Sequence, residues 1–280
     1  MAKLIGGITS SHIPAVGIAT TKRLFDEPYW KPFFDGYIPV REWMEKEKPD
    51  VIVSIYNDHG LNFFLDQVST FAIGAAKQYD NADEGWGLKT MPPVPGDVEL
   101  SWHIIETLNK DEFDITMCQE MKVDHGLIVP IQVIWPFADE WPVKVVPVAV
   151  NTVQHPVPSA KRCYDFGKSI GKAIRSYDED IKVVVFGTGG MSHQLQGERA
   201  GFINKRFDLD FMKKIVDNPE ELTKLTTTDL VREAGSEGVE LIMWLTMRGA
   251  LGGNVKQLHS NYHAPISNTG AGVLLLEPTD

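Results

Sequence analysis

The sequence of 280 residues predicts an α/β fold, a single-domain αβα sandwich around a mainly parallel or mixed β-sheet. Short runs of β-branched residues recur along the chain. Several are apolar on both faces, which is typical of strands that helices cover on both sides. Segments with apolar residues at helical spacing lie between these runs. No repeat or convincing linker divides the chain, so we expect one domain over residues 1–280.

Each predicted element follows from its own pattern. The strands are expected at the β-branched runs 3–9, 51–56, 67–73, 113–118, 143–150, 182–187 and 272–277. Helices are expected at 40–48, 97–109 and 159–177. The last of these has Pro158 and Ser159 as a start signal and apolar residues at helical spacing. Residues 83–97 are rich in proline and glycine and predict a long loop inside the domain, a kind of segment that is often functional.

Composition narrows the class of protein. The chain is 43% hydrophobic, as expected of a globular protein, and its net charge of -11 disfavours nucleic acid or an anionic membrane as the partner. Cys118 and Cys163 stand alone, so no disulfide framework or C-x-x-C motif is available. The apolar run at the start of the chain is too short for a signal peptide, and no apolar run reaches the length of a membrane span. We therefore expect a cytoplasmic protein that acts on a small molecule or another protein.

Three histidines occupy the same position relative to a predicted strand. His12, His59 and His193 each follow the end of an apolar run. Ligands of open α/β sheets bind outside the carboxyl ends of the strands, so these histidines could converge on one site. For each one alone, an ordinary histidine that makes a single hydrogen bond is the alternative.

Glu240 is the carboxylate that could complete such a site. A helix over 235–251 would be apolar nearly all round, and the glutamate would be buried with it. Because an isolated buried carboxylate is costly, such groups pair, bind metal or take up a proton. An ion pair with Arg248 or Arg232 would compensate the buried charge of Glu240 equally well. Glu237 lies one turn earlier, beside glycines, and is more easily solvated.

Two histidines and one carboxylate are the ligand set of non-haem Fe(II) oxygenases. The same ligands could hold Zn²⁺ for hydrolysis. Their spread between positions 12 and 240 cannot decide between the two metals, because no compact motif such as H-E-x-x-H is present.

The glycine-rich stretch 187–197 has a different alternative, a phosphate-binding loop in a non-catalytic binding subunit. No Lys followed by Ser or Thr is present, and Ser192 stands where the third glycine of G-x-G-x-x-G would be. We therefore interpret Gly187, Gly189 and Gly190 as a tight turn beyond a strand that places His193.

Several longer motifs carry a resemblance. They are GITSSHIPA (7–15), YNDH (56–59), ADEGWG (82–87), KVDHG (122–126), GTGGMSHQLQG (187–197), RAGFINKRFDLDF (199–211) and GSEGVELIMWLTMRGAL (235–251). Together they resemble the protocatechuate 4,5-dioxygenase β chains, in the class III (type II) extradiol ring-cleaving dioxygenase family. The likeness runs from residue 1 to about 250, and SNTGAGVLLLE (267–277) is the recognisable part beyond it.

The resemblance implies roles for individual residues. The Fe(II) ligands of the family fall on His12, His59 and Glu240. The acid/base histidine falls on His193, and a second catalytic histidine that lines the site falls on His125. A Ser-Asn pair that recognises the substrate carboxylate falls on Ser267 and Asn268, where a turn before the last strand is an equally good reading of the residues.

The resemblance also implies an activity and a partner. We expect a single catalytic extradiol dioxygenase domain over 1–280 that uses O2 to cleave protocatechuate at the 4,5 bond, giving 4-carboxy-2-hydroxymuconate semialdehyde in aromatic catabolism. Gallate or another substituted catechol is the alternative substrate. A separately encoded small α subunit is expected to cover the site in an α2β2-like hetero-oligomer.

Overall fold

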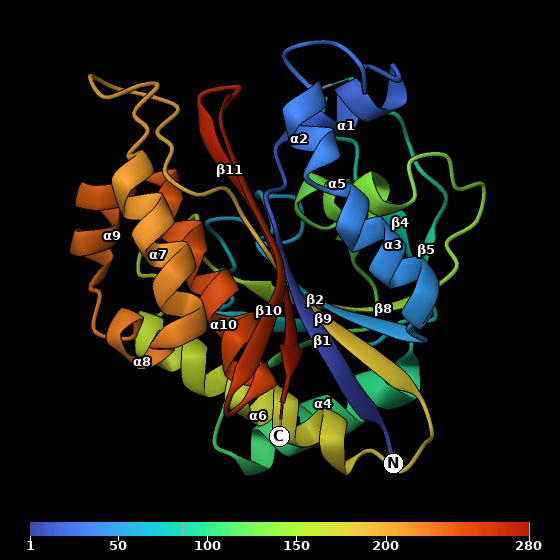
Figure 1. Ribbon diagram of the computed structural model, residues 1–280. Coiled ribbons are helices and arrows are strands. Elements are labelled where there is room, and N and C mark those ends of the chain that lie inside the picture. The colour runs from blue at the N-terminus through green and yellow to red at the C-terminus, as the bar shows by residue number, and fades with distance from the viewer. Residues whose placement is uncertain (86, 280) are drawn as a thin grey trace.

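A mixed sheet of eight strands forms the centre of the part of the molecule described by the computed structural model, residues 1–85 and 87–279 (Figure 1). Trp86 of the ADEGWG motif and Asp280 lie outside the described residues. The strands are β1 (Lys3–Ser10), β2 (Val51–Tyr56), β3 (Phe71–Gly74), β6 (Thr116–Cys118), β8 (Lys144–Val150), β9 (Lys182–Thr188), β10 (Val255–Ile266) and β11 (Thr269–Pro278).

The strand order places four parallel strands side by side. The order is β10-β11-β1-β9-β2-β8-β3-β6, and β1, β9, β2 and β8 run parallel. Strands β11 and β3 are antiparallel to β1 and β8, so the sheet is mixed. The carboxyl ends of the four central strands therefore meet at one edge.

Helices cover both faces of this sheet. Their bounds are α1 (Pro14–Thr21), α2 (Lys31–Asp35), α3 (Ile38–Glu47), α4 (Val98–Lys110), α5 (His125–Ile134), α6 (Ala160–Ser176), α7 (Lys205–Asp217), α8 (Pro219–Leu222), α9 (Thr227–Ala234), the 3-10 turn η1 (Glu237–Glu240) and α10 (Leu241–Leu251). Helices α1, α3 and α5 lie on one side, and α4, α6 and α10 lie on the other (Figure 1). The predicted αβα sandwich is confirmed. None of the described helices has the length and apolar character that crossing a membrane requires.

The central strands show why their sequences carry no polar face. Along β2, Val51, Val53 and Ile55 enter the core beneath α4, α6 and α10. Ile52 and Tyr56 enter the core on the opposite side. Successive side chains of a strand point to opposite faces, so a strand covered on both sides is apolar throughout.

Some predicted boundaries were wrong. The strand expected at 67–73 is confined to Phe71–Gly74, because the preceding residues turn, with the amide of Gln67 bonded to the carbonyl of Phe64. The strand expected at 113–118 begins at Thr116, because the amide of Phe113 still bonds to the carbonyl of Leu108 at the end of α4. A small second sheet was not expected; it contains β4 (Gln78–Asn81), β5 (Val94–Pro95) and β7 (Lys122–Val123).

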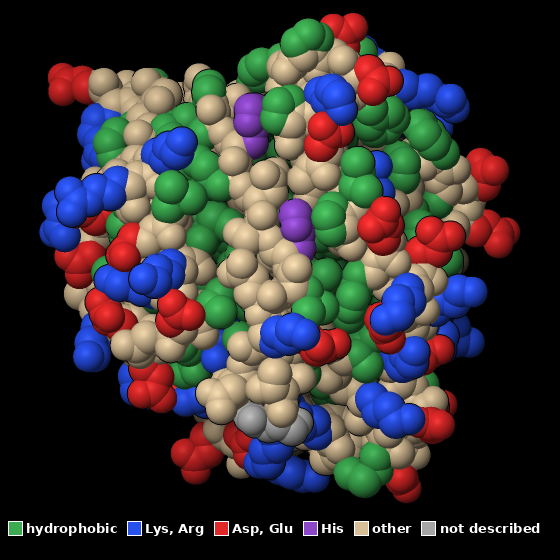
Figure 2. Space-filling view, viewed as in Figure 1, with side chains coloured by type: hydrophobic (Ala, Val, Ile, Leu, Met, Phe, Trp, Pro, Cys, Tyr) green, Lys and Arg blue, Asp and Glu red, His purple; other side chains and the backbone are tan. Residues whose placement is uncertain are grey.

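The long strand β10 was also not expected. It pairs with β11 at the edge of the large sheet, and most of its side chains are exposed or half-buried. Figure 2 shows charged side chains mainly toward the two sides of this face, while the strip over the β10–β11 hairpin is largely uncharged and includes histidines. The strand therefore lacks the apolar pattern by which the others were predicted.

Close packing of α6 against α10 fixes the helix that follows the candidate carboxylate. A Cβ atom on Gly167 of α6 would lie 1.9 Å from the carbonyl oxygen of Thr246 in α10. Only glycine permits this approach of the two backbones. Trp244 of α10 is fully buried, and its indole N–H donates to the carbonyl of Gly189 at 3.1 Å. These contacts hold the start of α10 against the carboxyl edge of the sheet.

Candidate metal centre and active site

The three histidines that follow strands come together at the carboxyl edge of the sheet. His12 follows β1, His59 follows β2 and His193 follows β9. They line one cavity of about 560 Å³ together with His125 and Glu240. Apolar residues such as Ile13, Ile18, Val153 and Leu195 form much of the remaining wall. Apolar pockets with a few convergent polar groups are the usual form of a small-molecule site.

Three side chains in this cavity have the separations that one metal ion requires. Nε2 of His12 lies 3.2 Å from Oε2 of Glu240, and Nε2 of His59 lies 3.9 Å from Oε1. Two ligand atoms that each bind one ion at about 2.1 Å are themselves about 3 to 4 Å apart. Two imidazoles and one carboxylate therefore fit a mononuclear non-haem metal centre.

The outer nitrogens of both candidate ligands are already engaged. Nδ1 of His12 lies 3.1 Å from the hydroxyl of Thr188, and Nδ1 of His59 donates to Asp124 at 3.0 Å. Partners of this kind set the orientation of metal-binding imidazoles. As a result, each ring turns Nε2 toward Glu240, and Nε2 of His59 also lies 3.1 Å from the side-chain amide nitrogen of Asn57.

Asp124 was quoted within a motif, but sequence reasoning assigned it no role. Its Oδ1 accepts from the amide of Gly126 and caps α5, while its Oδ2 accepts from both the amide and the ring of His59. Burial opposes its ionised form, but the charge and hydrogen bonds of His59 lower the pKa of Asp124 to about 2. An Asp just before an apolar run was the available signal, and it indicated only the helix cap.

Glu240 lies where η1 meets α10, at the end of a 3-10 turn rather than inside one continuous helix. Neither proposed arginine partner explains it in the described structure, since Arg232 pairs with Asp229 and Arg248 donates to the carbonyl of Ile215. Burial alone would raise the pKa of Glu240. The imidazoles around it outweigh burial and hold the pKa far below its usual range.

The glycine-rich loop brings two functional groups together. The amide of Gly190 donates to Oε2 of Glu240 at 2.7 Å. Gly189 has a φ of +124°, and a Cβ there would lie 2.8 Å from Cβ of Glu240. Gly187 lies within β9 rather than in the turn, and the next described helix begins only at Lys205. The loop therefore lacks the strand-loop-helix form of a phosphate cradle.

His193 presents a free nitrogen to the cavity. Its Nδ1 donates to the carbonyl of Met191 at 2.7 Å, and because a carbonyl only accepts, the proton of the neutral ring lies on Nδ1. Its Nε2 lies 3.8 Å from Oε2 of Glu240, and the residue is 7% exposed. A buried imidazole with an unprotonated nitrogen beside a metal position is suited to general-base chemistry.

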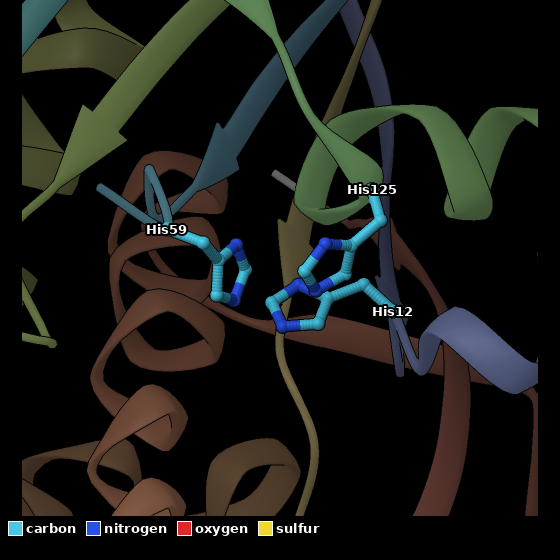
Figure 3. A group of neighbouring side chains, drawn as sticks. All are labelled: His12, His59 and His125. Carbon is cyan, nitrogen blue, oxygen red and sulfur yellow. The ribbon is translucent and has the colours of Figure 1, made fainter. Parts of the chain in front are cut away.

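His125 is the first residue of α5, and its ring meets the other two (Figure 3). The rings of His125 and His59 stack with centroids 3.9 Å apart, and His12 meets His125 edge-on at 5.5 Å. Burial and the neighbouring charge of His59 lower the pKa of His125. Its Nδ1 contacts the carboxylate of Glu84, a residue of the predicted long loop that sequence reasoning did not single out.

The carboxylates around His59 make its position favourable for positive charge. Burial lowers the stability of its charged form, but Asp124, Glu240 and Glu84 outweigh burial and raise the pKa of His59 to about 9. A bound cation at the same place would meet the same negative charges.

Ser267 and Asn268 form the two-residue turn between β10 and β11. Both have positive φ, 48° and 64°, and the flanking residues Ile266 and Thr269 pair. This is the geometry of a tight β-hairpin turn. Ser267 and Thr269 line the cavity, whereas Asn268 does not belong to its described lining. The structure therefore brings only Ser267 of the predicted pair to the cavity wall.

The fold and the side chains define a class, an α/β protein with histidines and a buried carboxylate brought together at the carboxyl edge of its sheet. Residues 6–273 match the family model described as the catalytic LigB subunit of aromatic ring-opening dioxygenase. The chain belongs to this family.

Curated relatives carry related names. Gallate dioxygenase of Pseudomonas putida is 44% identical over 199 residues, which cover 71% of this chain and 58% of the relative. The 2,3-dihydroxyphenylpropionate/2,3-dihydroxicinnamic acid 1,2-dioxygenase of Mycolicibacterium smegmatis is 30% identical over 159 residues, covering 57% and 48%. The chain thus spans about half the length of the curated relatives it matches. A crystal structure of an uncharacterized Escherichia coli K12 protein has a TM-score of 0.58 at 13% identity, covers 97% of this chain and 99% of its own, and supports the fold alone.

The double role of Asp124 predicts a double loss in Asp124→Ala. Removing the helix cap should lower the free energy of unfolding by about 1 kcal/mol. Removing the partner of His59 should also weaken the binding of a divalent metal ion about 10- to 100-fold. Asp97→Ala is the matched control, because Asp97 caps α4 through the amide of Leu100. It should lose stability and keep its metal affinity, as measured by denaturant titration and anaerobic metal titration. Equal metal affinities in the two variants would contradict the role of Asp124.

Proposed function

We propose that the chain catalyses Fe(II)-dependent extradiol cleavage of a catecholic acid with O2. The observation that carries the proposal is the convergence of His12, His59 and Glu240 with the free Nε2 of His193 in one cavity. Family membership supports the same reaction class. We further propose that residues 1–280 act as one catalytic domain.

In this proposal each side chain has a separate task. His12, His59 and Glu240 hold the Fe(II), which when bound lowers the pKa of a catechol hydroxyl and brings the catechol and O2 together. His193 accepts the hydroxyl proton at Nε2 and later returns it, and its bond to Met191 keeps that nitrogen available. His125 lines the ring site. Ser267, the member of the predicted pair that reaches the cavity wall, donates a hydrogen bond to the substrate carboxylate from the hairpin turn.

Protocatechuate, cleaved at the 4,5 bond to 4-carboxy-2-hydroxymuconate semialdehyde, is the first candidate substrate. Gallate is the second candidate, and the 44% identity to a gallate dioxygenase supports it. We also propose a small α subunit that covers the cavity in an α2β2-like assembly. The exposed side chains of Val153 and Leu195 at the cavity would gain cover from such a partner.

The proposal predicts oxygen consumption. Protein loaded with Fe(II) under anaerobic conditions should consume one O2 per protocatechuate or gallate once air is admitted, and should form a yellow ring-opened product. An oxygen electrode and the product spectrum measure both. The alternative, a Zn²⁺ hydrolase on the same site, predicts activity that survives removal of oxygen. If no catechol causes oxygen uptake, with or without a supplied α subunit, the proposed dioxygenase activity is wrong.

The division of tasks predicts two different variants. Glu240→Ala should abolish iron retention, because it removes the only carboxylate among the three proposed ligands. His193→Ala should retain iron and catechol and lose about 10²- to 10⁴-fold in kcat, the range of general acid–base catalysis. Iron content after desalting and steady-state rates give both readouts. Glu237→Ala removes another carboxylate from the cavity lining and should keep its iron. Loss of iron in His193→Ala would show that the tasks are assigned wrongly.

A further inference from the structure

We propose that Glu84 is a positioning residue for His125. Its carboxylate fixes the neutral imidazole with the proton on Nδ1, so that the ring offers an unprotonated Nε2 to the site. The role of that nitrogen in catalysis rests on the proposed function, while the fixed proton position does not.

One carboxylate takes both donors of His125. Oε1 of Glu84 accepts from the backbone amide of His125 at 2.7 Å, and Oε2 contacts Nδ1 of the ring. The side chains of both residues are only 6% exposed. An ionised carboxylate can only accept, so Nδ1 must carry the hydrogen that joins them. Two bonds from one rigid group fix the rotation of the ring as well as its proton.

The position of His125 in the chain explains why a carboxylate is stable there. His125 is the first residue of α5, and amides at the start of a helix have no partner within the helix. The positive end of the helix dipole also favours a negative group. Glu84 is therefore stabilised by the helix start independently of the imidazole, and is available to orient it.

The neighbouring ring has the same arrangement. His59 donates from Nδ1 to Asp124 at 3.0 Å, and its ring stacks on that of His125 with centroids 3.9 Å apart. Each imidazole therefore has its own buried carboxylate behind it. Figure 3 shows the rings of His12, His59 and His125 turned toward a common centre. The metal site proposed above uses only His59 of the stacked pair, which leaves Nε2 of His125 available to a ligand.

The chemical consequence concerns the catechol. With Nδ1 protonated, Nε2 of His125 accepts a hydrogen bond from a hydroxyl of the bound ring. The opposite tautomer would donate instead, and would disfavour the hydroxyl proton at that point. Glu84 thus determines whether His125 acts as an acceptor or a donor toward the substrate.

Glu84→Gln tests this with almost no change of shape. One of the two accepting oxygens becomes an NH2 group, which donates, so the backbone N–H and Nδ1–H of His125 can no longer each bond to an oxygen of their own. We expect proton correlation spectra of ¹⁵N-histidine-labelled, metal-free protein to place the His125 proton on Nδ1 in the unaltered chain. In Glu84→Gln it should move partly or wholly to Nε2. The His125 signals are identified by their absence in His125→Asn.

The kinetic readout is a split between kcat and KM. Loss of an outer partner of a site histidine should lower kcat about 10- to 100-fold, with a smaller effect on KM because the metal still binds the catechol. Asp83→Asn is the matched control, since Asp83 is an exposed carboxylate of the same loop that accepts from the amide of Gly85. It should keep the spectrum and kcat of the unaltered protein.

The outcomes separate the two proposals. A proton on Nε2 of His125 in the unaltered chain, or an unchanged tautomer and kcat in Glu84→Gln, would overturn the role of Glu84. The first of these results does not depend on Glu84→Gln, so a folding defect in that variant leaves the test intact. Failure of the unaltered protein to cleave any catechol would instead refute the dioxygenase, and the spectra would still decide where Glu84 places the proton.

Discussion

The burial of one ionised carboxylate is the constraint on which this site depends. Glu240 is 6% exposed and begins a helix whose residues are all buried. A carboxylate in such surroundings is unstable without compensation. The compensation comes from the imidazoles of His12, His59 and His193 and from the amide of Gly190. The histidines follow the ends of strands, the amide belongs to the glycine turn, and the packed helix α10 holds the carboxylate beside them.

The sheet topology makes this compensation possible. Because β1, β9 and β2 are parallel neighbours, residues that follow them in the chain reach one place although they are far apart in sequence. The α6–α10 contact then brings Glu240 to that place from another part of the chain. Several imidazoles around one carboxylate suit a bound cation, because a metal ion can take the place of a proton on an imidazole nitrogen.

Hydrogen-bond partners behind the histidines determine which nitrogen of each ring faces the cavity. Asp124 and Glu84 each bond to both the backbone and the ring of one histidine. Met191 and Thr188 serve the rings of His193 and His12 through a carbonyl and a hydroxyl. In the three rings whose partner can only accept, Nδ1 carries a hydrogen and Nε2 faces inward.

The sequence was sufficient to predict the parts of this site that are marked by a pattern of neighbouring residues. The positions of His12, His59 and His193 after apolar runs were sufficient to expect them at one sheet edge. The burial of Glu240 followed from its apolar neighbours. Strand β10 was not predicted, because most of its side chains are exposed or half-buried and apolar residues do not recur along it in a regular pattern.

The supporting carboxylates could not be predicted in the same way. Glu84 meets His125 across 41 residues, and Asp124 meets His59 across 65. No local pattern encodes those pairings, which depend on how β4, β7 and α5 are placed by the fold. The turn at Ser267 and Asn268 was readable from the sequence, but which of the two would face the cavity depends on the twist of the hairpin.

The most direct test of the account is the coordination of iron itself. A crystal structure of the protein loaded anaerobically with Fe(II), with anomalous diffraction to locate the metal, would show the ligands. We predict one iron bound to Nε2 of His12, Nε2 of His59 and a carboxylate oxygen of Glu240, with His193 and His125 near the metal and unbound. Iron held by His193 or His125, or bound outside this cavity, would contradict the account.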